Sequence, residues 1–168
     1  LQVDNDAPQK AVLSVRVNKS YLQKNKGNDY SFLLYSGGTI TTVNFKLDSE
    51  LTKFDFVKRR LHTGVNTVTL FSGTGEPLAE RLFFVQNYDK LTLTINSDKP
   101  VYASRERVGI RLNTKNRADS AVSGHYSVSV IDETKVPVDE NTESSILSTL
   151  LLTDDLKGTV EEPAYYFN

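Results

Sequence analysis

The chain has 168 residues, contains no cysteine, methionine or tryptophan, and carries a formal net charge of −1. The lack of cysteine excludes disulfides, thiolate metal sites and thiol nucleophiles, and the balanced charge argues against a nucleic-acid partner or an anionic membrane surface. No apolar run approaches the roughly 18 residues that a membrane-spanning helix needs. Because neither an initiator methionine nor a signal peptide is visible, we expect a processed protein or a piece of a longer one.

Apolar and polar residues alternate with a period of two through the first half of the chain, which is typical of half-buried strands. Residues 3–8 are predicted to be a flexible, turn-rich lead-in. The alternation predicts a strand at 12–17, a hairpin of 30–35 and 39–47 around Ser36-Gly37-Gly38, short alternation followed by a basic loop in 53–64, and a second hairpin of 65–71 and 78–85.

The second half continues the strand pattern and adds one helix. Strands are predicted at 91–97, 107–112 and 125–131. Residues 143–156 repeat apolar side chains at helical spacing, with Thr142 as N-cap and Gly158 at the C-terminal end. The tail at 164–168 is predicted to be strand-like.

Short strands separated by regular turn signals indicate an all-β fold built from antiparallel sandwiches. A polar hinge at 86–90 divides the chain into two predicted domains, 1–87 and 88–168. The second domain offers fewer strands than the seven that a sandwich usually contains, so we expect it to be incomplete or to hide further strands.

The stretch SDKPVYASRERVGIRLNTKNRADSAVSGHYSVSVIDE, residues 97–133, resembles the macroglobulin-type (MG2-like) domain of the α2-macroglobulin superfamily. The matching positions are Asp98, Lys99, Pro100, Tyr102, Glu106, Val108, Val128, Val130, Asp132 and Glu133. Ser104-Arg105 replaces the family's Pro-Gly before the glutamate, and Ala118-Asp119-Ser120 replaces its Asp-Gly turn. Residues 63–85 are similar to the preceding module of large cell-envelope proteins of Gram-negative bacteria, some of which carry a plug domain like that of TonB-dependent receptors.

This resemblance implies two tandem Ig-like, macroglobulin-type sandwich modules from a larger exported protein of the periplasm or cell surface, associated with the outer membrane. The implied function is non-catalytic: spacing of domains and contact with other domains of the parent protein or with an envelope protein. The thioester chemistry of the superfamily needs a cysteine, which this chain lacks.

The sequence offers few binding candidates. Arg105, Glu106 and Arg107 form a mixed-charge cluster, and Arg107, Arg111 and His125 would share an outer face if 107–112 paired with 125–131. This set is either a ligand-binding patch or, as we favour, a solvated face whose charges block edge pairing. Glu106, paired with a neighbouring arginine, would fix the approach into the strand. Exposed aromatic residues are a second source of contacts. Packing in a core or hinge is the favoured interpretation for most of them, and Tyr21 and Tyr35 are included among the candidate binding residues.

No catalytic constellation is visible, and we predict neither enzyme activity nor a cofactor. His62 and His125 lack the partners of a metal site or a nucleophile–base pair. Asp132-Glu133 with Asp98 supplies too few oxygens for Ca²⁺, which takes six to eight, so we predict no metal. An alternative function is that of a carbohydrate-binding or adhesin module, in which surface tyrosines would contact a glycan.

Overall fold

The computed structural model describes residues 1–87, 89–132, 134–136 and 144–167. Leu1–Asn87 together with 144–167 form one compact unit (unit 1), and the described residues of 89–136 form another (unit 2). The predicted domains, 1–87 and 88–168, stay a prediction, while the contacts group 144–167 with the first part of the chain. Each unit is described separately below.

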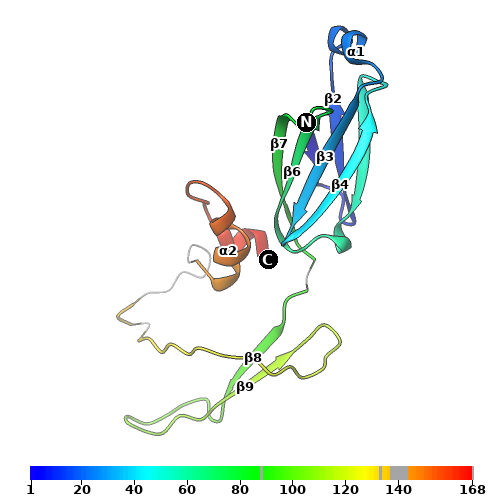
Figure 1. The fold of residues 1–168 in the computed structure, drawn as a ribbon. Coiled ribbons are helices and arrows are strands. Elements are labelled where there is room, and N and C mark those ends of the chain that lie inside the picture. The colour runs from blue at the N-terminus through cyan, green and yellow to red at the C-terminus, as the bar shows by residue number, and fades with distance from the viewer. Residues whose placement is uncertain (88, 133, 137–143, 168) are drawn as a thin grey trace. The chain divides into compact units, whose positions relative to one another are not determined.

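Seven strands in two antiparallel sheets make up most of unit 1 (Figure 1). One sheet has the order β1-β2-β5 and the other β4-β3-β6-β7. The strands are β1 (Gln2–Asp4), β2 (Lys10–Arg16), β3 (Asp29–Ser36), β4 (Thr39–Lys46), β5 (Leu51–Val57), β6 (Gly64–Ser72) and β7 (Pro77–Val85). The predicted all-β class and both predicted hairpins are confirmed.

Alternating residues from both sheets fill the core of unit 1. Ala11, Leu13 and Val15 of β2 are at most 3% exposed and face the other sheet. Phe32 of β3 is 1% exposed, and its ring centroid lies 4.9 Å from that of Phe54 in β5. Because side chains in a strand point alternately to opposite faces, this core fixes the register of every strand that contributes to it.

Two elements of unit 1 are absent from the sequence-based prediction. Residues 3–8, predicted to be a lead-in, begin with β1, which pairs with residues 12–14 of β2. The helix α1 (Lys19–Asn25) follows β2, and its N-cap Asn18 accepts a 2.8 Å hydrogen bond from the Tyr21 amide. A short 3₁₀ helix, η1 (Lys58–Arg60), forms the predicted basic loop.

The C-terminal segment of unit 1, residues 144–167, is helical rather than extended. It contains α2 (Ile146–Leu151) and the 3₁₀ helices η2 (Thr153–Asp155) and η3 (Pro163–Phe167). The predicted helix is confirmed over its centre, with Ser145 as N-cap in a capping box with Ser148; Thr142 lies outside the described residues. The predicted strand-like tail is wrong over 164–167, which belong to η3; Asn168 lies outside the described residues.

Unit 2 contains a two-stranded antiparallel sheet of β8 (Thr92–Ser97) and β9 (Ile110–Lys115). None of its described residues is buried. The predicted strand at 107–112 begins three residues later, and the predicted strand at 125–131 is not formed. Across the described parts of both units, no helix is long and apolar enough to cross a membrane.

Candidate functional site

A row of mostly apolar side chains crosses the outer face of the four-stranded sheet. Backbone pairing places Ile40, Tyr35, Thr67 and Leu82 side by side on β4, β3, β6 and β7. Ile40 is 60% exposed, Tyr35 43% and Leu82 48%. The outer face of an antiparallel sheet is normally polar. This row therefore marks a surface that can exclude water from a partner.

The C-terminal segment packs beside this row. The Phe84 ring of β7 lies 5.8 Å from Tyr166 and 5.3 Å from Phe167, both edge to face. Gln86 Nε2 donates a 3.2 Å hydrogen bond to the Phe167 carbonyl. At Gly64, φ is +125°, and a side chain there would begin 3.0 Å from the Leu151 carbonyl oxygen. Glycine is thus what allows α2 to approach β6 so closely.

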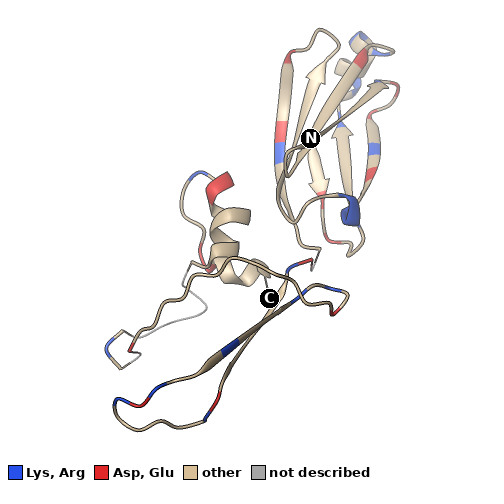
Figure 2. Ribbon diagram, turned by 60° about the horizontal axis from the view of Figure 1, so that its bottom comes forward, with Lys and Arg blue, Asp and Glu red and all other residues tan. Residues whose placement is uncertain are grey.

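The packed segment is acidic. Residues 144–167 hold four carboxylates against a single lysine, Lys157; the acidic positions are red in Figure 2. The carboxylates are those of Asp154, Asp155, Glu161 and Glu162. On the sheet, Glu80 lies one row away from Leu82 and accepts a 2.9 Å hydrogen bond from the Thr69 hydroxyl. Two of these carboxylates are placed at the apolar surface, Glu80 on the sheet and Glu161 of the segment, and each favours a cationic neighbour.

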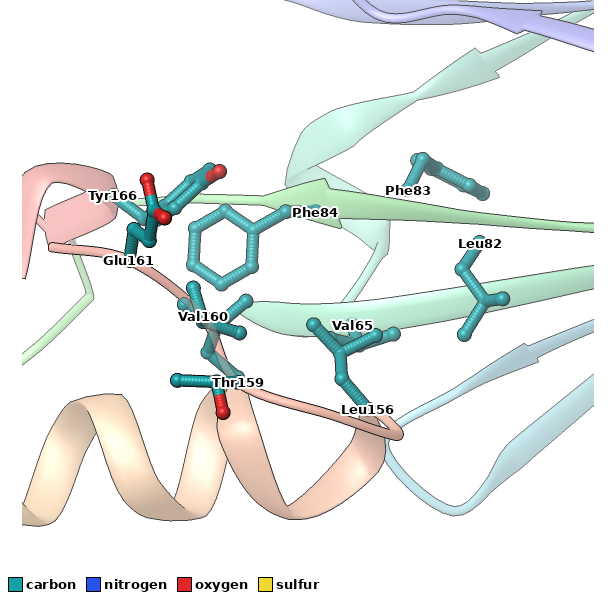
Figure 3. A pocket seen from close by; sticks show the side chains of 10 residues that line it. Val65, Leu82, Phe83, Phe84, Leu156, Thr159, Val160, Glu161 and Tyr166 are labelled. Carbon is teal, nitrogen blue, oxygen red and sulfur yellow. The ribbon is translucent and has the colours of Figure 1, made fainter. Parts of the chain in front are cut away.

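A groove of about 490 Å³ separates the segment from β6 and β7 (Figure 3). Its lining is mainly apolar, with a carboxylate and two hydroxyls as its polar side-chain groups. It consists of Val65, Leu82, Phe83, Phe84, Leu152, Leu156, Thr159, Val160, Glu161 and Tyr166. A mainly apolar hollow of this size with few polar groups has the composition of a binding site for a small molecule or a peptide side chain. Leu82 belongs to both the row and the groove, so the two form one continuous surface, which we call the outer-face site.

Sequence reasoning missed most of this site, because it assigned the segment to a different domain. One signal was present. Residues 82–85 read LFFV, with no polar residue on either face. A continuous apolar run is typical of a strand that is covered on both sides. The core covers one side of β7, and the segment covers the other side at Phe84.

The mixed-charge stretch singled out from the sequence lies in a loop before β9, residues 98–109, which we call the Asp98 loop. Tyr102 donates its hydroxyl proton to Asp98, and the Gly109 amide donates to Asp98 Oδ1 at 3.0 Å. The Lys99 amide in turn donates to the Tyr102 hydroxyl at 3.0 Å. The hydrogen bond from Tyr102 first, and that from the Gly109 amide second, lower the pKa of the Asp98 carboxyl.

Glu106 closes the same loop. It accepts hydrogen bonds from the Lys99 ammonium and, at 2.8 Å, from the Ala103 amide. Lys99 first and the Ala103 amide second lower the pKa of Glu106. The predicted pairing of Glu106 with an arginine is wrong, because Lys99 reaches the carboxylate from the other side of the turn. The groups of the loop are satisfied by one another, which is the arrangement of a structural turn.

Arg105 adopts a left-handed conformation in this loop, with φ of 63°. A left-handed backbone at a non-glycine residue destabilises the folded loop by about 1–2 kcal/mol. Glycine would remove this strain, although it also gives the unfolded chain more conformational entropy. We expect Arg105→Gly to slow hydrogen exchange of the Gly109 amide about two- to fivefold, measured by NMR. The matched control is Arg107→Gly, whose φ is not positive and which should speed exchange. Faster exchange of the Gly109 amide in Arg105→Gly would contradict the expected stabilisation of the loop.

The structure does not bring the predicted arginines and histidine together on one sheet face. Arg105 and Arg107 lie in the Asp98 loop, Arg111 lies on β9 opposite Asn96, and His125 is in no strand. The shared face required 107–112 to pair with 125–131, and residues 125–131 form no strand beside β9. All four side chains are exposed, and their role in binding stays a prediction.

The two predicted tyrosines have different surroundings. Tyr21 on α1 is hydrogen-bonded to Tyr30 at 3.0 Å between the hydroxyl oxygens. Burial first, and this hydrogen bond second, raise the pKa of Tyr30 to about 12. Tyr35 lies in the outer-face row and is the single tyrosine of that row. A glycan platform built from several tyrosine rings is therefore not assembled there, and glycan binding stays a prediction.

Within the described residues, no group of three or more His, Asp or Glu side chains is placed to hold a metal ion. The chain matches no protein-family model, no curated protein and no solved structure. The geometry of the sites therefore carries the functional argument.

Proposed function

We propose that the chain is a pair of Ig-like, macroglobulin-type modules that serves as a non-catalytic structural and interaction part of a larger exported envelope protein. The strand order of unit 1 supports the Ig-like part of this proposal. The first, second and fifth strands share one sheet, and the third, sixth and seventh share the other, as in immunoglobulin domains. The fourth strand joins the third here, whereas in constant-type domains it joins the fifth.

The Asp98 loop supports the macroglobulin part of the proposal. Asp98, Lys99, Tyr102 and Glu106, all positions of the family pattern, belong to one hydrogen-bonded network. Arg105 stands where the pattern has glycine and has φ of 63°, and Asp119, in the turn that replaces Asp-Gly, has φ of 58°. These are backbone conformations that glycine adopts at little cost. A backbone geometry typical of glycine at both positions supports the proposed resemblance.

The outer-face site is the observation that carries the interaction role. Apolar side chains on this sheet face are about half exposed, and the face is continuous with an apolar groove. An exposed apolar surface of this kind is typical of a site that a partner covers. The carboxylates beside the groove select a partner segment that combines apolar anchors with basic neighbours. The proposed occupant is such a segment of another protein or of another domain of the parent protein.

Two matched peptides test this role. The probes are acetylated Lys-Leu-Phe-Leu-Lys and acetylated Glu-Leu-Phe-Leu-Glu, each titrated into the full chain while methyl resonances are followed by NMR. We expect the lysine peptide to shift the methyls of Val65, Leu82 and Val160. The glutamate peptide should bind at least tenfold more weakly, because its charges oppose those of the segment.

A pair of variants on the same strand provides the control. Leu82→Asp should abolish the shifts caused by the lysine peptide. Leu78→Asp, at a position 43% exposed compared with 48% for Leu82, should leave them unchanged because Leu78 does not line the groove. Equal binding of both peptides, or shifts confined to residues outside the outer-face site, would refute the proposed role of this surface.

A further inference from the structure

Residues 123–131 of unit 2 have a sequence typical of a strand, but their backbone is not paired with a neighbouring strand. The preceding residues begin a hairpin with β9: Lys115 is bridged to Ala121, and the Val122 amide donates to the Thr114 carbonyl at 3.0 Å. Beyond this point, residues 123–131 make no backbone hydrogen bond with any part of the described structure. We call residues 123–131 the free segment.

The side chains of the free segment are suited to a sheet. Tyr126, Val128 and Val130 alternate with Ser127 and Ser129, and aromatic and β-branched residues favour strands. Tyr126 is 49% exposed, Val128 70% and Val130 85%. Their apolar side borders a cavity of about 420 Å³ shared with Leu93, Ile95, Ile110 and Leu112 of the β8–β9 sheet. The Tyr126 hydroxyl is hydrogen-bonded to the Thr114 hydroxyl of β9 at 2.5 Å. The backbone of the segment is unsatisfied, and its two valine side chains are mostly exposed.

Nothing in the free segment opposes association with another strand. No Lys, Arg, Asp or Glu occurs between residues 120 and 131. Natural edge strands usually carry such charges, or a proline, to prevent pairing with a second chain. Because this exposed, strand-forming stretch lacks such residues, nothing blocks its pairing with a strand of a second chain.

The segment is also self-complementary. In an antiparallel pair of two copies centred on Val128, Val128 lies opposite its own counterpart, Tyr126 lies opposite Val130, and Ser127 lies opposite Ser129. Tyr126, Val128 and Val130 then meet apolar residues on one face; on the other face the serines meet, and Ile131 lies opposite His125. A slip of one residue would place valines opposite serines and is disfavoured. A two-fold axis through Val128 generates this arrangement, as isologous dimers require.

We propose that two copies of this chain associate through their free segments as antiparallel strands related by a two-fold axis at Val128. The contact lies outside the outer-face site and does not depend on the proposed function of that site. A single strand from each copy contributes less surface than the roughly 800 Å² per partner of a standard specific interface. The dimer is accordingly weak and depends on concentration.

Two experiments on the full chain test the pairing. Sedimentation equilibrium between about 10 and 500 µM should show a dimer that Val128→Lys abolishes. The matched control is Val101→Lys, at a position in the same unit that is 79% exposed, and this variant should dimerise like the wild type. Because the chain has no cysteine, Val128→Cys introduces a unique thiol opposite itself. It should form a disulfide-linked dimer at least tenfold faster than Val101→Cys.

Other occupants of the free segment give distinct results, each of which overturns the proposal. A chain that stays monomeric over the whole concentration range, with equal rates of cross-linking at 128 and 101, excludes pairing of two copies. Cross-strand NOEs between 110–115 and 125–131 in a monomer would show that the segment pairs within its own chain. A dimer that survives Val128→Lys uses a different surface.

Discussion

Replacing Phe32 with alanine is expected to lower the free energy of unfolding of unit 1 by about 3–5 kcal/mol. Phe32 is 1% exposed, and its ring contacts Phe54 and Phe56 of β5 edge to face, with centroid distances of 4.9 and 5.6 Å. It also lies 6.4 Å from Phe45 of β4. Alanine would remove the ring on which both sheets converge and leave a cavity between them.

Urea denaturation followed by far-UV circular dichroism measures this loss, and hydrogen exchange in β3 and β6 assigns it to unit 1. Ile40→Ala is the control. Ile40 is 60% exposed on the outer face, so its loss should change stability by no more than about 0.5 kcal/mol. A loss below about 1 kcal/mol for Phe32→Ala would show that the aromatic cluster does not form the centre of the sandwich.

The core strands of unit 1 were predictable because one face of each is buried and the other is not. Alternation in β2, β3 and β6 follows directly from that asymmetry. β1 and α1 lack it. β1 has three residues and no buried side chain, and α1 has seven residues and none buried either. β1 is held by backbone pairing with β2, and α1 is capped by Asn18. A hydrophobic pattern in the sequence contains neither kind of information.

The outer-face site was only partly predictable for a related reason. Patterning tells which side chains require burial, but not which distant element provides it. The LFFV run of β7 and the helical spacing of 146–151 were both visible, yet nothing in either specified that one covers the other. Gly64 completes the contact, and its role depends on a φ of +125° and a neighbouring carbonyl. Of the predicted binding residues, Tyr35 is the one that lies in this site.

In unit 2 the prediction failed in the opposite way: residues 125–131 have the alternating pattern of a strand but no neighbouring strand to pair with. Residues 125–131 alternate as clearly as those of β2, but strand propensity mainly reflects packing against neighbouring strands. Without a hydrogen-bonded neighbour the segment is not a strand in the structure. A two-stranded sheet is itself marginal in water, which is consistent with the absence of buried side chains among the described residues of this unit. This mismatch between pattern and pairing is the observation from which the proposed pairing of two copies is argued.

The second large effect is expected from Leu152→Ala, which should release the C-terminal segment from the sheet. Leu152 is 3% exposed and lines the groove against β6 and β7. Truncating such a leucine costs about 2–5 kcal/mol, and the loss falls on the docking of a short segment that has few other buried side chains. Amide hydrogen exchange in 146–151 should accelerate at least tenfold, and the lysine peptide should no longer shift the Val65 and Leu82 methyls.

Leu150→Ala provides a closely matched control, because Leu150 belongs to the same segment and is 61% exposed. It should leave both the exchange rates and the peptide titration nearly unchanged. If Leu152→Ala also leaves exchange in 146–151 unchanged, the segment is not held by the groove. If it speeds exchange while the peptide still binds with undiminished affinity, the row of Ile40, Tyr35 and Leu82 is sufficient for recognition without the segment. Comparison of the two leucines thus separates the contribution of the sheet face to partner binding from that of the helical segment beside it.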